Sequence, residues 1–124
     1  MMKILIVDDD EQVRRFVSRA LEGEGFTCST AANGREAMKK IEAETFDVVL
    51  LDVLMPEADG VQVLNDLRKL AIGPKLHVIA MSGGGATLPG WYAGSLMEML
   101  GVESVLYKPF SVDELLSKIT ASAA

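Results

Sequence analysis

Residues 3–10 read KILIVDDD, a short apolar run that ends in three consecutive aspartates. Residues 47–52 repeat the form as DVVLLD, in which four aliphatic residues lead directly into Asp52. Apolar runs without polar alternation are typical of strands that are buried on both faces, as in a parallel sheet. The two stretches therefore predict buried strands that carry carboxylates at their carboxyl ends.

The same kind of run recurs along the chain and alternates with helical patterns. The predicted strands are Lys3–Val7, Phe26–Thr30, Asp47–Leu51, Leu76–Met81 and Ser104–Leu106. Apolar residues spaced three or four apart predict five helices, each with one apolar face. These faces comprise Val13, Phe16, Val17, Ala20 and Leu21; Ala37, Met38 and Ile41; Val63, Leu64 and Leu67; Ala93, Leu96, Met97 and Leu100; and Val112, Leu115, Leu116 and Ile119. We therefore expect an α/β fold, a (βα)₅ doubly wound parallel sheet.

Helix ends are also marked in the sequence. A capping side chain stands three residues before a Glu or Gln at Asn33–Glu36, Asp59–Gln62 and Ser111–Glu114. Helices should end at Gly23 or Gly25, at Gly73 and at Gly101.

Composition narrows the class of protein. The chain has 124 residues, 49% of them hydrophobic, and a formal net charge of −6, which suits one domain over residues 1–124 with no output domain in this chain. The acidic balance without a Lys/Arg cluster argues against nucleic acid as a direct partner. The longest aliphatic runs have four residues, so we expect no membrane span. The single cysteine, Cys28, fits a reducing, cytoplasmic location and is expected to be a small core residue.

Polar residues follow four of the five predicted strands. In chain order they are Asp8, Asp9 and Asp10; Asp52; Ser82 with Gly83; and Lys108. Because open parallel sheets bind ligands at the carboxyl ends of their strands, these side chains should meet at one edge. Two carboxylates about 4 Å apart repel by roughly 4 kcal/mol at an effective dielectric constant of 20, so converging carboxylates need a proton or a cation.

A hard divalent cation fits this edge. Mg²⁺ binds one or two carboxylates and keeps room for phosphate oxygens, and Mn²⁺ can substitute for it. Lys108 and Ser82 would then supply a positive charge and a hydrogen-bond donor to an anion beside the metal. Each motif alone also suits a helix N-terminus, a turn or a loop. Their joint occurrence favours phosphoryl transfer onto an aspartate.

Four motifs, in order, give the chain a family resemblance: KILIVDDD at 3–10, DVVLLDVLMP at 47–56, MSG at 81–83 and KPF at 108–110. Over residues 2–122 the chain resembles response-regulator receiver domains of the CheY-like, single-domain kind. The resemblance implies a flavodoxin-like fold with strand order 2-1-3-4-5. It also implies a phospho-acceptor signalling domain, not an enzyme, with only self-phosphorylation and slow autodephosphorylation. Its partners would be a histidine kinase or histidine phosphotransfer protein and a downstream protein target, and it would be a monomer or weak dimer.

The resemblance also assigns roles to individual residues. Asp52 would be the phospho-acceptor and, with Asp9, a direct Mg²⁺ ligand. Asp8 would bind the metal through water and Leu54 through its backbone carbonyl. The phosphoryl group would be held by Ser82, Gly83 and Lys108, and the Lys108–Pro109 bond would be cis.

Two departures from the family pattern concern the conformational change that carries the signal. Val105 stands where many receivers carry Tyr or Phe, and an aromatic residue lies instead at Tyr107. We therefore expect the signal to pass through residues 83–90 and the helix after them, with Tyr107 near a docking face. Trp91 is expected either on a partner surface or folded over the glycine-rich segment.

Three other functions remain open. A small Mg²⁺-dependent phosphohydrolase could use Asp52 as nucleophile, but it needs an acid two residues later, where the chain has Leu54. A flavin-binding electron carrier would suffer repulsion between the cofactor phosphate and Asp8–Asp10. A phosphorylation-independent interaction module would fit the same fold.

Overall fold

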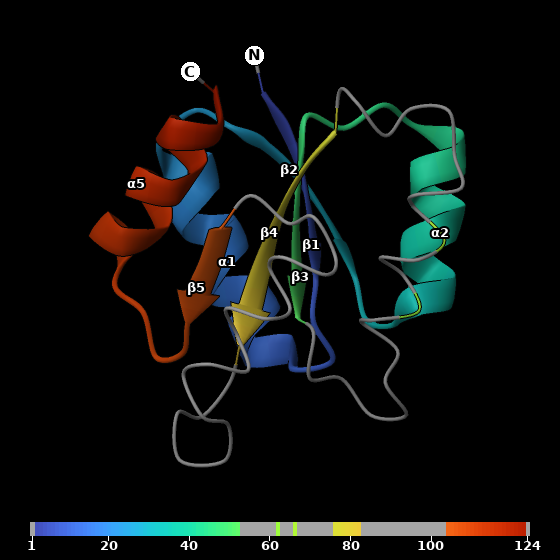
Figure 1. The fold of residues 1–124 in the computed structure, drawn as a ribbon, viewed down its shortest axis with the longest axis horizontal. Coiled ribbons are helices and arrows are strands. Elements are labelled where there is room, and N and C mark those ends of the chain that lie inside the picture. Colours follow the sequence, from blue (N-terminus) through green and yellow to red (C-terminus); the bar gives the residue numbers. More distant parts are fainter. Residues whose placement is uncertain (1, 53–61, 63–65, 67–75, 83–103, 124) are drawn as a thin grey trace.

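The computed structural model describes residues 2–52, 62, 66, 76–82 and 104–123. They contain a five-stranded sheet with helices on both faces (Figure 1). The strands are β1 (Lys3–Val7), β2 (Thr27–Ala31), β3 (Val48–Asp52), β4 (His77–Ser82) and β5 (Ser104–Tyr107). They lie in the order β2-β1-β3-β4-β5 and every neighbouring pair is parallel, which confirms the expected sheet and its strand order.

Three helices flank the sheet in the described part of the chain: α1 (Glu11–Gly23), α2 (Gly34–Ala43) and α5 (Val112–Ala123). Helices α1 and α5 lie together on one face and α2 lies on the other (Figure 1). Of the predicted third helix, the structure describes only Gln62 and Asp66, both helical. The predicted fourth helix lies outside the described residues.

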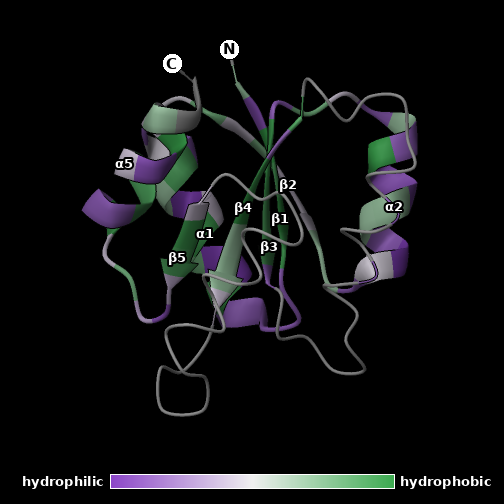
Figure 2. Cartoon of the chain, viewed as in Figure 1, coloured by the Kyte–Doolittle hydropathy of each residue, from purple (hydrophilic) through white to green (hydrophobic). Residues whose placement is uncertain are grey.

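The apolar strands contribute to two cores because successive side chains point to opposite faces. On the α2 side, Leu5 and Val7 of β1 pack with Ala37 and Ile41 of α2. On the other side, Ile4 and Ile6 pack with residues of α1 and α5, among them Val17, Leu21, Leu115 and Ile119. Figure 2 shows the result: hydrophobic central strands lie between helices that carry hydrophilic residues on their outer faces. Strands β1 and β3 are thus buried on both faces, as their uniform apolar runs predicted.

Helix α1 ends in a Schellman motif, which moves the start of β2. The N–H of Gly25 donates to the carbonyl of Glu22 at 3.0 Å, and the N–H of Phe26 donates to the carbonyl of Leu21 at 3.1 Å. Gly25 has φ +93°, a left-handed conformation that glycine adopts without a steric penalty. Phe26 therefore belongs to the helix stop, and β2 begins at Thr27 rather than at the predicted Phe26.

Two predicted helix starts are confirmed. The N–H of Glu36 donates to Asn33 Oδ1 at 2.9 Å, and the N–H of Glu114 donates to Ser111 Oγ at 3.1 Å. The start predicted at Asp59 lies outside the described residues. Strand β1 has the predicted limits. Strands β3 and β4 are each shifted by one residue, to Val48–Asp52 and His77–Ser82, and β5 extends one residue further, to Tyr107.

Two residues expected on core-facing helix faces are exposed instead. Phe16 is 44% exposed and Val112 is 37% exposed. Helix α1 contacts the sheet through Val17 and Leu21, which leaves Phe16 at the seam between α1 and the start of α5. There its ring centroid lies 6.2 Å from that of Phe110. The helical period identified the apolar stripe of α1 but overestimated how much of it the sheet covers.

The helix stop gives a matched pair of stability predictions. A Cβ added at Gly25 or at Gly23 meets no other heavy atom within 4 Å, so steric clashes contribute to neither change. Gly25→Ala should lower the free energy of unfolding by about 1–2 kcal/mol, because alanine must adopt the left-handed conformation. Gly23→Ala should raise it by up to about 1 kcal/mol, because Gly23 is helical. Urea unfolding of both variants measures the difference, and equal effects would contradict the assigned motif.

Candidate functional site

The carboxyl ends of four strands bring the predicted site residues together. Asp8 follows β1, Asp52 and Ser82 end β3 and β4, and Lys108 follows β5. In the parallel register Asp52 lies beside Met81, and Ser82 lies beside Tyr107. Asp8 is fully buried, and Asp52 and Ser82 are 4% and 5% exposed. The lengths and register of the strands thus bring these polar side chains together at the carboxyl edge of the sheet.

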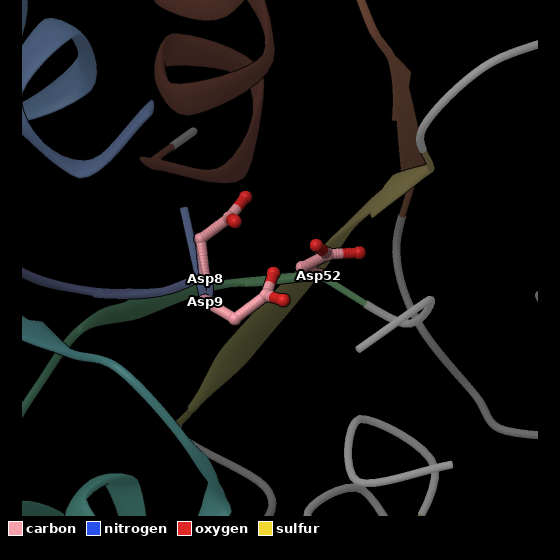
Figure 3. A group of neighbouring side chains, drawn as sticks. All are labelled: Asp8, Asp9 and Asp52. Carbon is pink, nitrogen blue, oxygen red and sulfur yellow. The ribbon is translucent and has the colours of Figure 1, made fainter. Parts of the chain in front are cut away.

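Three carboxylates converge at this edge. One oxygen from each of Asp8, Asp9 and Asp52 lies within 4.8 Å of the others. Figure 3 shows the Asp9 side chain extending from the end of β1 towards Asp52. Asp9 is the exposed member, while Asp8 and Asp52 are buried. The cluster therefore opens to solvent on the Asp9 side.

Lys108 partly balances these charges. Its Nζ donates to Asp8 Oδ2 at 2.6 Å and to Asp52 Oδ2 at 3.2 Å. Burial by itself lowers the pKa of Lys108, but the hydrogen bond to Asp8 and the charges of Asp52 and Asp8 outweigh it, so the pKa lies above its usual value. The backbone N–H of Lys108 also donates to the carbonyl of Ser82 at 2.8 Å. The lysine is thus held in its charged form at the edge.

Asp8 is held at each of its polar groups. Its N–H donates to the Ala31 carbonyl at 3.1 Å, and its Oδ1 accepts from the N–H of Asp10 at 2.9 Å. Asp10 is the N-cap of α1, where its Oδ1 accepts from the N–H of Gln12 at 2.8 Å. The carbonyl of Asp8 accepts from Arg14 Nη1 at 2.7 Å. Hydrogen bonds therefore fix the loop between β1 and α1 at both of its ends.

The contact made by Arg14 was missed from the sequence. Its place in the helical pattern assigns it to the solvent-facing side of α1, together with Arg15 and Arg19. The signal available was its position four residues after the N-cap, from which a long side chain can reach back over the loop.

The donor set fits a divalent metal ion. Carboxylate oxygens are hard ligands of the kind that Mg²⁺ binds, usually one or two at a time together with water. Within the cluster, three carboxylates face one ammonium group, so a negative charge remains for a cation to balance. The exposed Asp9 leaves a route for a hydrated ion.

The remaining sequence predictions have mixed outcomes. The Lys108–Pro109 bond is cis, as expected. Val105 is buried against the α2-side core, and Tyr107 is 49% exposed. Three further expected site residues lie outside the described part of the chain: Leu54, Gly83 and Trp91. The same holds for the expected signal route through residues 83–90.

The environment of Cys28 disfavours its thiolate form. Burial, with a smaller contribution from the charge of Glu22, raises its pKa to about 11. Thiolate is the reactive form, and little of it is present near neutral pH at such a pKa. Cys28 also packs against the core on the α1 side, as its prediction as a small core residue requires.

A groove adjoins the charged edge. A cavity of about 390 Å³ lies between the start of α1 and the loop after β5, lined by Asp10, Gln12, Val13, Phe16, Lys108, Pro109 and Phe110. A second cavity, of about 580 Å³, shares Phe16 and extends along α1 past Arg15 and Arg19 to Val112. The exposed Phe16 ring thus lines both hollows, and the first of them reaches the lysine of the site.

None of the helices that the structure describes has the length and hydrophobicity needed to span a membrane.

Comparison with known proteins places the chain in a family. Residues 4–120 match the response regulator receiver domain. The transcriptional regulatory protein CpxR homolog of Haemophilus influenzae is 38% identical over 121 residues, which cover 98% of this chain and 50% of that protein. The chain spans about half the length of the curated relatives it matches.

Solved structures agree with this match. The chemotaxis response regulator CheY4 of Vibrio cholerae has a TM-score of 0.87 at 30% identity, with 98% of each chain covered. The response regulator TrrA of Thermotoga maritima, in complex with Mg²⁺-BeF, has a TM-score of 0.81 at 30% identity, with 98% of this chain and 99% of that chain covered. Sheet order, the acidic edge with its lysine and these likenesses lead to one conclusion: this chain belongs to the response regulator receiver domains of two-component signalling systems.

Proposed function

We propose that Asp52 accepts a phosphoryl group from a phosphohistidine of a partner protein, in a reaction that requires Mg²⁺ or Mn²⁺. The observation that carries this proposal is the convergence of Asp8, Asp9 and Asp52 around the ammonium group of Lys108. The Mg²⁺-BeF complex of TrrA, a receiver of the same fold, adds support. Asp9 and Asp52 are the direct metal ligands in this proposal, with Asp8 acting through water and Leu54 through its carbonyl.

The residues of the chain then have distinct chemical roles. An oxygen of the Asp52 carboxylate bonds to phosphorus as the bond from phosphorus to the donor imidazole nitrogen breaks, and the electron pair remains on that nitrogen. Lys108 already donates to Asp52 at 3.2 Å, so its charge lies where the phosphoryl oxygens arrive. The proposal assigns the hydroxyl of Ser82 and the backbone N–H of Gly83 as further donors to these oxygens. A bound metal ion supplies further positive charge to the carboxylates and the phosphoryl oxygens.

The chain acts in this proposal as a signalling domain. The product is an acyl phosphate, which the chain itself hydrolyses slowly, and the phosphorylated domain docks on a downstream protein or passes the group on. Leu54 lacks the acid that the phosphohydrolase alternative needs. The buried Asp8 and the neighbouring Asp9 and Asp10 would repel the phosphate of a flavin. We also propose a cytoplasmic location, with which a single free thiol is compatible.

The donor protein must cover the acidic edge to bring its histidine to Asp52. The groove at Phe16 and Phe110 begins at Lys108, so it lies next to any such protein. An aromatic ring that is 44% exposed in a hollow is well suited to anchor a partner. We therefore assign the groove to the phosphohistidine donor.

Metal binding can be tested with two neighbouring aspartates. Asp9→Asn and Asp10→Asn each remove one negative charge with little change in shape, but only Asp9 belongs to the carboxylate cluster. Asparagine also serves as an N-cap, so Asp10→Asn keeps the start of α1. We expect Asp9→Asn to weaken Mg²⁺ binding about tenfold or more and Asp10→Asn to change it little. Titration followed by NMR shifts measures both, and equal weakening would show only a general charge effect.

Phosphorylation can be followed by intact mass after incubation with Mg²⁺ and acetyl phosphate. The wild-type chain should gain one phosphoryl group that hydroxylamine removes, because an acyl phosphate is an activated ester. Chelation of the metal or the change Asp52→Ala should abolish the gain, whereas Asp10→Asn should retain it. Lys108→Ala should keep part of the labelling but impair the conformational response to phosphorylation. Labelling of Asp52→Ala under the same conditions would refute Asp52 as the acceptor.

The groove predicts a difference between donors. Phe16→Ala should slow transfer from a phosphohistidine protein by about 10- to 30-fold, the effect of losing roughly 2 kcal/mol at an aromatic anchor. Transfer from acetyl phosphate should stay unchanged, because a small donor needs no docking surface. Lys39→Ala truncates an exposed side chain of α2, on the other face of the sheet and outside both grooves, so it serves as the surface control. Equal slowing with both donors would locate the effect at the acceptor instead.

A further inference from the structure

We propose that Arg14 is a positioning residue that orients Asp9 towards the metal ion by fixing the peptide unit between Asp8 and Asp9. This inference rests on the proposed cation site. It adds to that site a residue of α1 that touches neither the carboxylate oxygens nor, in the proposed arrangement, the metal.

The geometry begins with one hydrogen bond. Arg14 Nη1 donates to the main-chain carbonyl of Asp8 at 2.7 Å, in a partly buried position. That carbonyl belongs to the peptide unit that continues into Asp9. Because a peptide unit is planar, holding its oxygen fixes the plane and with it the direction in which the Asp9 Cα leaves the strand end.

The other polar groups of Asp8 are already held by different partners. Its N–H is bound by Ala31, and its carboxylate accepts from Asp10 and Lys108. These contacts fix Asp8 itself, whereas the rotation of the following peptide unit depends on the carbonyl. Asp9 is exposed, so burial does not fix its side chain. Arg14 is thus the side chain that holds the backbone immediately before the exposed ligand.

The position of Arg14 also argues for a specific role. A positive charge near the N-terminus of a helix lies close to the positive end of the helix dipole, which is unfavourable. It also lies near a site proposed to take a cation, and simple electrostatics would weaken cation binding. Arg15, the next residue, instead extends to solvent and pairs with Glu11 at 3.2 Å. The two arginines therefore differ in contact while sharing charge, helix and neighbourhood.

The two explanations, orientation and charge, predict opposite changes in Mg²⁺ affinity when Arg14 is replaced. If Arg14 acts by orientation, Arg14→Met should weaken Mg²⁺ binding about tenfold, within the range seen when a group that orients a metal ligand is lost. If it acts only through its charge, the same change should tighten binding. Arg15→Met is the matched control, because it removes the same charge from the same helix, and it should leave the affinity unchanged or slightly raised. Arg14→Lys should restore much of the loss, since one N–H donor is enough for a single bond.

A measurement without metal separates orientation from stability. In EDTA, the backbone amide of Asp9 should become more mobile in Arg14→Met, with its NMR order parameter falling from about 0.85 towards 0.6. The amides of β1 should stay rigid. A merely structural role would lower the thermal midpoint and loosen α1 as a whole without singling out Asp9.

The outcomes distinguish this inference from the proposed function. The role of Arg14 is supported if Asp9→Asn and Arg14→Met both bind Mg²⁺ more weakly than wild type while Arg15→Met binds it nearly as well. It also requires that Asp9 becomes mobile in Arg14→Met in EDTA. Unchanged or tighter binding by Arg14→Met, while Asp9→Asn is weakened, overturns the role of Arg14 and leaves the metal site standing. Unchanged binding by Asp9→Asn overturns both. If Arg14→Met folds poorly, Arg14→Leu, which also lacks a hydrogen-bond donor and is a good helix former, takes its place under the same criteria.

Discussion

The ion pair between Lys108 and the fully buried Asp8 is the constraint on which the site depends. A buried carboxylate is costly unless it is paired, and loss of one partner of a buried pair typically costs about 3–5 kcal/mol. Strands β1 and β5 are separated by β3 and β4, so the pair spans roughly 14 Å of sheet, at about 4.8 Å per strand step. One lysine therefore holds the last strand to the first across their carboxyl ends.

The same pair leaves the site incompletely balanced. Lys108 contacts Asp8 and Asp52, while Asp9 lies exposed within 4.8 Å of both carboxylates. Full neutralisation by a second buried cation would make a more stable edge, but it would leave no charge for a metal ion to balance. The residual negative charge is thus a local cost in stability that makes the edge receptive to a cation and, with it, to a phosphoryl group.

The first turns of α1 combine several of these roles because the helical period presents successive residues in different directions. Asp10 caps the helix, Arg14 reaches back to the carbonyl of Asp8, and Phe16 faces the groove. Val17 and Leu21 anchor the helix to the sheet. A change in how α1 packs would therefore move the loop that carries Asp9 together with the surface assigned to the donor.

Much of the fold follows from local pattern. The uniform apolar runs that end at Val7 and Leu51, separated by helical periods, favoured a parallel sheet, since strands buried on both faces lack polar alternation. Strand order came from the family resemblance, because the pattern of each strand says nothing of its neighbours. Even so, placing acids, a hydroxyl and a lysine after the strands was enough to predict one charged edge.

Other features were decided only by tertiary structure. Periodicity could not show that Phe16 is left exposed beside Phe110, because exposure depends on what packs opposite. Nor could it show that Arg14 turns back to Asp8 while Arg15 extends to solvent, because both occupy the polar side of the same helix. The sequence by itself determined which chemical groups reach the edge. The packing of α1 against the sheet decided which of them touch, because contacts between distant residues depend on three-dimensional placement that no local spacing encodes.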